Sequence, residues 1–225
     1  ATPACLGTPV VFTNTTTGTA PFTYLWAFGD GGTSTETNPI HTITTDVESG
    51  ASSYVDAGQV AALGTSFNGS VTINAERGDT TAGSVVATAM ELSITGIGAY
   101  SFESTAGGAG TVYMPSALCQ AFGGQNSFYA VQNTSDSADA SVTVTYSNGA
   151  TQSATIDPLS KTSFNTCNAT GMTTGFSGSA TITSSTDAVA IGKVTGTGLT
   201  TAFVGASSGG DRLAQAAVGA RDEGR

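Results

Sequence analysis

The residues with the most potential for chemistry are a serine-glycine motif and the single histidine of the chain. Residues 205–209 read Gly-Ala-Ser-Ser-Gly and fit the G-x-S-x-G pattern of a hydrolase nucleophile, with Ser207 at the centre. That pattern works on a strand-turn-helix elbow of an α/β sheet, followed along the chain by an acid and then a histidine. His41 lies far upstream, and no α/β pattern surrounds the motif. We therefore interpret the motif as a chance match in a chain rich in Ser and Gly, and we expect no enzyme.

Metal ligands are equally sparse. One histidine and three widely spaced cysteines give no zinc constellation. Asp30, Asp136 and Asp139 stand in segments expected to be turns or loops, where extracellular sandwiches sometimes bind calcium through carboxylates. No D-x-D-x-D-G loop is present, so we expect no metal centre and no cofactor, with a structural calcium ion as the alternative. Paired glycosidase-type carboxylates also stay open, although nothing in the sequence places two acids opposite each other.

Four asparagines stand in N-x-S/T sequons and are candidate glycosylation sites: Asn14, Asn68, Asn133 and Asn168. Many sequons in a threonine-rich chain are accidental, so these four matter only if the host glycosylates its exported proteins.

The charge balance excludes some partners. Lys and Arg total 6 against 16 Asp and Glu, which gives a net charge of −10. A nucleic-acid surface needs clustered Lys and Arg, and anionic membranes attract the same residues. No apolar run approaches the ~20 residues that span a bilayer. We expect no nucleic-acid partner and no membrane span. The abundance of Thr, Ser and Gly is instead typical of a secreted protein outside the cell.

Alternating apolar and hydroxylated residues predict strands in four segments: Phe22–Phe28, Phe67–Ile73, Val142–Tyr146 and Phe176–Ile182. One apolar face and one hydroxylated face suit an antiparallel sheet with one side in water. Turn residues at 29–32 and 147–149 separate such strands. No long stretch shows helical spacing, so the sequence predicts an all-β fold.

Internal repetition sets the expected number of domains. The pattern at Phe12–Thr16 recurs at Val131–Ser135, and the pattern at Phe67–Ile73 recurs later in the same order, at Phe176–Ile182. Each unit has roughly the 100 residues of one sandwich. We predict two tandem immunoglobulin-like β-sandwich domains, with these bounds: 1–105, 111–206, and a C-terminal tail at 207–225. A small-residue stretch between the two units suits a linker.

The N-terminal segment resembles a known family. Residues 24–31 read Tyr-Leu-Trp-Ala-Phe-Gly-Asp-Gly, and Asn38–Thr42 follow after a short gap. This stretch resembles the first half of a polycystic-kidney-disease (PKD) domain, and the resemblance ends after Thr42. It implies an immunoglobulin-like sandwich of the kind found in extracellular adhesion and surface proteins. It supplies no catalytic residue.

The cysteines fall unevenly between the two units. Cys119 and Cys167 both lie in the second unit, and an exported chain oxidises a suitably placed pair. We predict a disulfide between them. Cys5 holds the corresponding place in the first unit, but its would-be partner position near Asp56 is not a cysteine. Cys5 is therefore left free or bonded to another chain.

Two functions fit these observations. The first is an extracellular structural or adhesive protein, a subunit of a surface filament or layer that assembles head to tail through its sandwich edges and termini. Only Lys161 and Lys193 could supply lysines to block those edges, and unblocked edges pair with other strands. The second is a carbohydrate- or ligand-binding accessory module of a larger secreted enzyme.

Overall fold

The computed structural model describes residues 8–11, 22–27, 33–35, 40–60, 63, 68–79, 81–92, 99–196 and 199–208. Its strands are β1 (Thr8–Val11), β2 (Trp26–Ala27), β3 (Thr33–Ser34), β4 (Ile40–Ile43), β5 (Thr88–Leu92), β6 (Ala99–Glu103), β7 (Ala109–Cys119), β8 (Asn126–Asn133), β9 (Ala140–Tyr146), β10 (Thr151–Ile156), β11 (Lys161–Asn165), β12 (Phe176–Gly196) and β13 (Leu199–Val204). Two short 3₁₀ turns, η1 (Ala57–Gln59) and η3 (Thr166–Asn168), are the helical elements in this part of the chain. The all-β prediction is confirmed.

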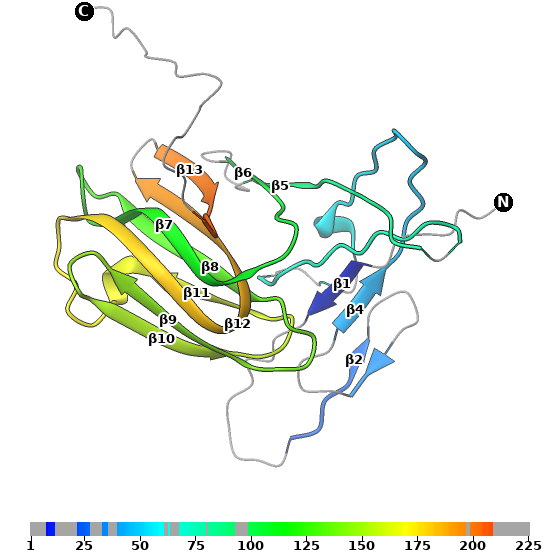
Figure 1. The fold of residues 1–225 in the computed structure, drawn as a ribbon, viewed down its shortest axis with the longest axis horizontal. Coiled ribbons are helices and arrows are strands. Elements are labelled where there is room, and N and C mark those ends of the chain that lie inside the picture. The colour runs from blue at the N-terminus through cyan, green and yellow to red at the C-terminus, as the bar shows by residue number, and fades with distance from the viewer. Residues whose placement is uncertain are drawn as a thin grey trace, which may run out of the picture.

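One antiparallel sheet of seven strands forms from residue 109 onward (Figure 1). Its centre is β12, a strand of 21 residues. The first half of β12 pairs with β7 and β9, and the second half pairs with β8 and β13. The pairing register with β7 shifts between Thr183 and Ala188, where β12 passes from its first set of partner strands to its second. A bridge between Tyr113 and Ala206 then links β7 to the end of β13, so the sheet curls almost into a barrel.

The core of this sheet follows from strict alternation along its strands. In β9 the residues Val142, Val144 and Tyr146 are buried, while Ser141 and Thr145 face solvent. In β8 the buried set includes Tyr129 and Val131. Side chains from β7 to β12 meet in one large hydrophobic cluster. Leu118, Ala121 and Val194 form a smaller cluster, and Phe203 packs against both. Because successive strand residues point to opposite faces, the alternating pattern places the buried residues of each strand together on the face that the neighbouring strands bury.

The turns in this region match their sequence signals. Gly149 adopts φ +88° at the end of the 147–149 turn, a conformation that glycine reaches at little cost. The Asn148 side chain accepts a hydrogen bond from the Ala150 backbone N–H at 3.0 Å and holds the turn closed. The predicted strands at Val142–Tyr146 and Phe176–Ile182 are both present.

The described residues before Ser104 have a different architecture. They form three two-stranded sheets, β1–β4, β2–β3 and β5–β6. Within the described residues 22–27, the strand predicted at Phe22–Phe28 is present only as Trp26–Ala27. Within the described part of Phe67–Ile73, Val71 forms a single bridge. Both predictions were too long, because alternation yields a strand only where a partner strand and a core receive it. A second sandwich over 1–105 is not confirmed.

The two regions meet around residues 104–108. Residues 104–107 are exposed, and Gly107 adopts φ +93°. Strand β7 begins at Ala109. A Cβ added to Gly108 would lie 2.8 Å from the Ala188 backbone nitrogen, so only glycine fits this crossing. The described chain ends at Ser208, and the rest of the predicted tail lies outside the described residues.

Candidate functional site

The sheet face formed by β8, β11 and the second half of β12 differs from an ordinary wet face. Outward residues of β10, such as Thr151 and Ser153, are exposed. The outward residues Phe128 and Ala130 of β8 and Ile191 of β12 are instead half-buried. We call the surface formed by Phe128, Ala130, Gln132, Lys161, Val189, Ile191 and Lys193 the docking face. The chain that contacts it comes from residues 68–103.

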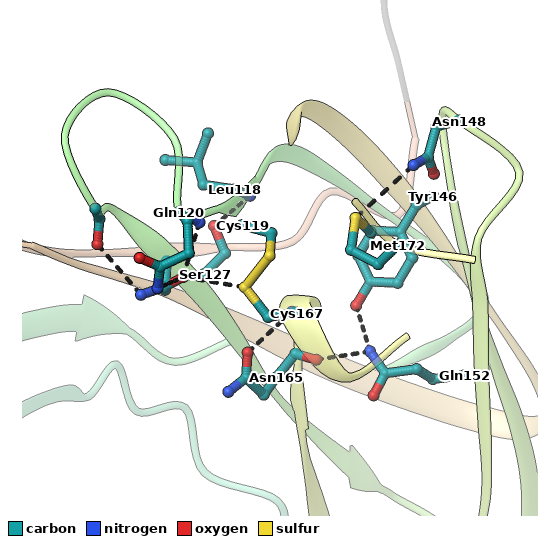
Figure 2. The surroundings of a disulfide bond; sticks show 12 residues. Leu118, Cys119, Gln120, Ser127, Tyr146, Asn148, Gln152, Asn165, Cys167 and Met172 are labelled. Carbon is teal, nitrogen blue, oxygen red and sulfur yellow. Dashed lines mark hydrogen bonds between the residues drawn. A yellow bond between two sulfur atoms is a disulfide. The ribbon is translucent and has the colours of Figure 1, made fainter. Parts of the chain in front are cut away.

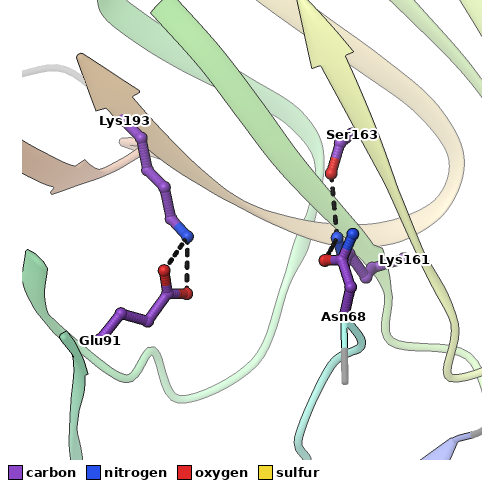
Figure 3. A network of polar contacts seen from close by, with 5 residues as sticks. All are labelled: Asn68, Glu91, Lys161, Ser163 and Lys193. Carbon is purple, nitrogen blue, oxygen red and sulfur yellow. Dashed lines mark hydrogen bonds and ion pairs between the residues drawn. The ribbon is translucent and has the colours of Figure 1, made fainter. Parts of the chain in front are cut away.

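One edge of the docking face is held by residues 68–72. The Ser70 hydroxyl donates to the Leu159 carbonyl at 2.8 Å, and the Gln132 amide donates to the Thr72 hydroxyl at 3.1 Å. The Lys161 ammonium donates to the Asn68 side-chain oxygen and to Ser163 Oγ (Figure 3). These contacts all run through side chains, so they fix the segment without making it a strand of the sheet.

At the other edge of the docking face, Lys193 contacts the β5–β6 hairpin. Its ammonium lies 2.6 Å from both carboxylate oxygens of Glu91 (Figure 3). The same ammonium lies 5.1 Å from the ring centroid of Tyr100 and 5.9 Å from that of Phe102, within cation–π range. Glu91 pairs with Tyr100 in the hairpin register, so one face of the hairpin presents both the acid and the rings. Lys193 therefore contacts a carboxylate and two aromatic rings on the same face of the hairpin.

Burial and neighbouring charge shape the electrostatics of the docking face. Desolvation, followed by the nearby positive charge of Lys193, lowers the pKa of Lys161, while the Glu91 carboxylate opposes this shift. Burial, together with the Glu91 charge, raises the pKa of Tyr100. Both lysines of an acidic chain thus gather on one face. Each ammonium group donates to a side-chain oxygen of the segment that covers the face, Asn68 for Lys161 and Glu91 for Lys193.

The opposite face of the β5–β6 hairpin is apolar and open. Met90 is 67% exposed and Leu92 is 70% exposed. They pair across the hairpin with Ser101 and Ala99, whose small side chains do not cover them. Val86, just before β5, is 91% exposed. A strip of large apolar side chains therefore faces solvent in the single chain.

A disulfide fixes one end of the seven-stranded sheet. Cys119 at the end of β7 is bonded to Cys167 in η3, the pairing expected from the sequence, with the two Cα atoms 4.9 Å apart (Figure 2). The β7–β8 loop that follows holds Gln120 at φ +50° and Phe122 at φ +47°, a region that side-chain-bearing residues rarely adopt. Phe122 is 73% exposed at the tip of this loop. The loop therefore presents one aromatic ring from a constrained backbone.

The four sequons have different surroundings. Asn14 lies outside the described residues, whereas Asn68 and Asn168 are exposed. Asn133 is fully buried, and its amide nitrogen donates to three backbone carbonyls, those of Ala138, Ile156 and Asp157. A glycan on that nitrogen would displace these bonds and has no space in the folded core. The sequence prediction of a glycosylation site at Asn133 is wrong for the folded protein.

The other candidate residues do not come together. Ser207 is exposed just past β13, no helix follows it as far as Ser208, and Gly209 lies outside the described residues. His41 is buried in β4. Asp136 and Asp139 lie in the β8–β9 loop. The described residues contain no group of three or more His, Cys, Asp or Glu able to hold a metal.

Two further sequence predictions fall on residues whose position is not described, namely Asp30 and Cys5. Among the helical segments that the structure does describe, none has the length and apolar character to cross a membrane.

Comparison with known proteins adds little. No protein-family model and no curated protein matches the chain. One solved structure, described as the crystal structure of Thermotoga maritima 1070, aligns with 15% identity and a TM-score of 0.36. That alignment covers 45% of this chain and 96% of the other. We draw nothing about function from a similarity this low.

Proposed function

We propose that the protein is a subunit of an extracellular filament or surface layer that assembles through contacts between copies. One observation carries the proposal. Eleven of the thirteen large apolar side chains that are exposed in the described structure precede residue 105, whereas Leu63 is the only buried apolar residue described there. Contiguous exposed apolar surface marks sites of protein association. In an assembly these apolar side chains would be buried against another copy, whereas the single chain leaves them exposed.

The tandem immunoglobulin-like architecture is part of the proposal. For 111–206 its support is the antiparallel strands that enclose one large core. For 1–105 its support is the short two-stranded sheets, whose unpaired edges are templates for strands of another copy. The extracellular location is supported by the disulfide, because such bonds persist in oxidising compartments and are rare in the cytosol.

The first test removes the exposed apolar strip. The triple variant Val86→Asp, Met90→Asp and Leu92→Asp is expected to stay monomeric at concentrations at which the unaltered chain forms large species in sedimentation velocity. Three carboxylates on this strip make its burial against another acidic copy unfavourable. The matched control is Tyr113→Asp, a 48% exposed aromatic residue on the sandwich, which is expected to assemble normally. Assembly of the triple variant at the same concentration as the unaltered chain would contradict the proposal.

Phe122 supports a second candidate function, carbohydrate binding by an accessory module. Its exposed ring stands on the same loop as Gln120, whose side-chain amide donates to the Asn126 side-chain oxygen at 3.1 Å. Aromatic rings flanked by amides suit the apolar faces and hydroxyls of sugars. On this reading the chain is retained by microcrystalline cellulose or chitin in a pull-down, Phe122→Ala releases it, and Phe122→Trp retains it. Equal recovery of the alanine variant, or no retention of the unaltered chain, removes this candidate.

A further inference from the structure

We infer that the docking face binds residues 68–103 of a second copy of this chain, so that copies are linked by exchange of their N-terminal halves. The inference rests on the proposed function and names the contact that would carry it. In the single chain the docking face is contacted by its own residues 68–72 and by strands β5 and β6. In the assembly the same contacts are made between copies.

Chemical complementarity identifies the occupant. The described sandwich from Ala109 to Ser208 carries two cationic side chains, Lys161 and Lys193, and both lie on the docking face. The net charge of −10 makes most other approaches between copies repulsive. Residues 68–103 offer Glu91 between two rings for Lys193 and the Asn68 side-chain oxygen for Lys161. A second copy brings the same matched set to the same lysines.

The connection between the two halves is suited to opening. Residues 104–107 are exposed, whereas Gly108 is fixed against Ala188 at the start of the sheet. The stretch has few ties: Ser104 bonds back to Ala87, and the Thr105 hydroxyl donates to the Gly107 carbonyl at 2.9 Å. Exchange of an identical element through a short hinge costs little, because each interaction that breaks within one chain forms again with the next.

The contact joins two different surfaces, so it links the subunits head to tail into an open chain. The donated hairpin and the docking face are different surfaces, so a copy that receives a hairpin still has its own hairpin to donate. Such a heterologous contact repeats into a filament unless the rotation closes a ring. Dilution favours the closed single chain and concentration favours the exchanged state, because the bonds are the same in both.

Charge reversal separates exchange from a contact within one chain. Lys193→Glu places two carboxylates opposite each other, and Glu91→Lys places two ammonium groups opposite each other. Each variant alone weakens the contact equally in the closed chain and between copies, because like charges face each other wherever the contact forms. Neither variant alone is therefore expected to assemble at a lower concentration than the unaltered chain.

An equimolar mixture of the two variants restores the charge pairing between chains. The introduced glutamate of one variant meets the introduced lysine of the other, and the remaining native Lys193 meets the remaining native Glu91. Because the pairing is restored only between chains, the mixture is expected to assemble at a concentration at least about tenfold lower than either variant alone, with both variants in equal amounts.

The readout is sedimentation velocity with a different fluorophore on each variant, and the double variant Lys193→Glu, Glu91→Lys serves as the folded control. Two results overturn the inference while leaving the proposed function in place. One is that the double variant assembles but the mixture of single variants stays monomeric, which confines the contact to one chain. The other is that the mixture assembles at no lower concentration than the single variants. Failure of the unaltered chain to assemble at any concentration overturns the proposed function and this inference together.

Discussion

The Asn133→Ala variant is expected to lose about 4 kcal/mol of free energy of unfolding, because each buried polar group left without a partner costs about 1–3 kcal/mol. The Asn133 amide nitrogen donates to the carbonyls of Ala138, Ile156 and Asp157 at 2.7, 3.1 and 3.2 Å. Its oxygen accepts from the Ser135 backbone N–H at 3.0 Å and from the Thr186 hydroxyl at 2.8 Å. An alanine side chain would leave several of these carbonyl, N–H and hydroxyl groups without their hydrogen-bond partner.

The same side chain ties the β8–β9 loop, the end of β10 and strand β12 together, which is why the expected loss is a large share of a typical domain's stability. Urea denaturation at constant pH measures it. Asn148→Ala is the matched control, since Asn148 is exposed and caps a single turn, and its loss is expected to be about 1 kcal/mol. The interpretation of Asn133 as a structural residue is wrong if the two variants unfold at the same urea concentration.

Removal of the disulfide is expected to have a similar effect through a different cause. Cys119 and Cys167 are separated by 48 residues in sequence. Closing a loop of that length restricts the unfolded chain and stabilises the folded one by about 4 kcal/mol in the chain-entropy treatment. The paired variant Cys119→Ser, Cys167→Ser should therefore unfold at a lower denaturant concentration, with the loss seen equally on reduction of the unaltered chain.

Cys5→Ser is the control for that prediction. It removes a cysteine that is outside the pair, so the unfolding midpoint under oxidising conditions should not move. A midpoint that is insensitive to reduction, or peptide mapping that pairs Cys5 with either other cysteine, would contradict the assignment of the disulfide.

The fold was predictable where sequence alternation and a core coincide. Val142, Val144 and Tyr146 alternate with hydroxylated residues, and the structure buries all three. The same reasoning failed at Phe67–Ile73, because alternation reports which side chains could face a core and not whether one is present. Val71 there is 51% exposed. The alternation pattern therefore predicted a sandwich in the N-terminal half that is not confirmed, although the same pattern matches buried strands in the other half.

The docking face was not predictable in the same way. In the sequence, Lys161 and Lys193 stand out only as the scarce lysines, and no local pattern connects Lys193 with Glu91, which is 102 residues away. The curled sheet and the covering hairpin bring them together. One signal was available: Tyr100 and Phe102 alternate as in a strand with one buried face. The glycosylation prediction at Asn133 failed because a sequon is a local sequence pattern, whereas the burial of Asn133 depends on residues far away in the sequence.

The central claim is that the chain assembles with itself, and sedimentation velocity of the intact protein from micromolar to millimolar concentration tests it most directly. We expect species that grow steadily with concentration, that appear as filaments by electron microscopy, and that return to monomer on dilution. A single monomeric boundary at every concentration, with no filament on the grids, would contradict the claim.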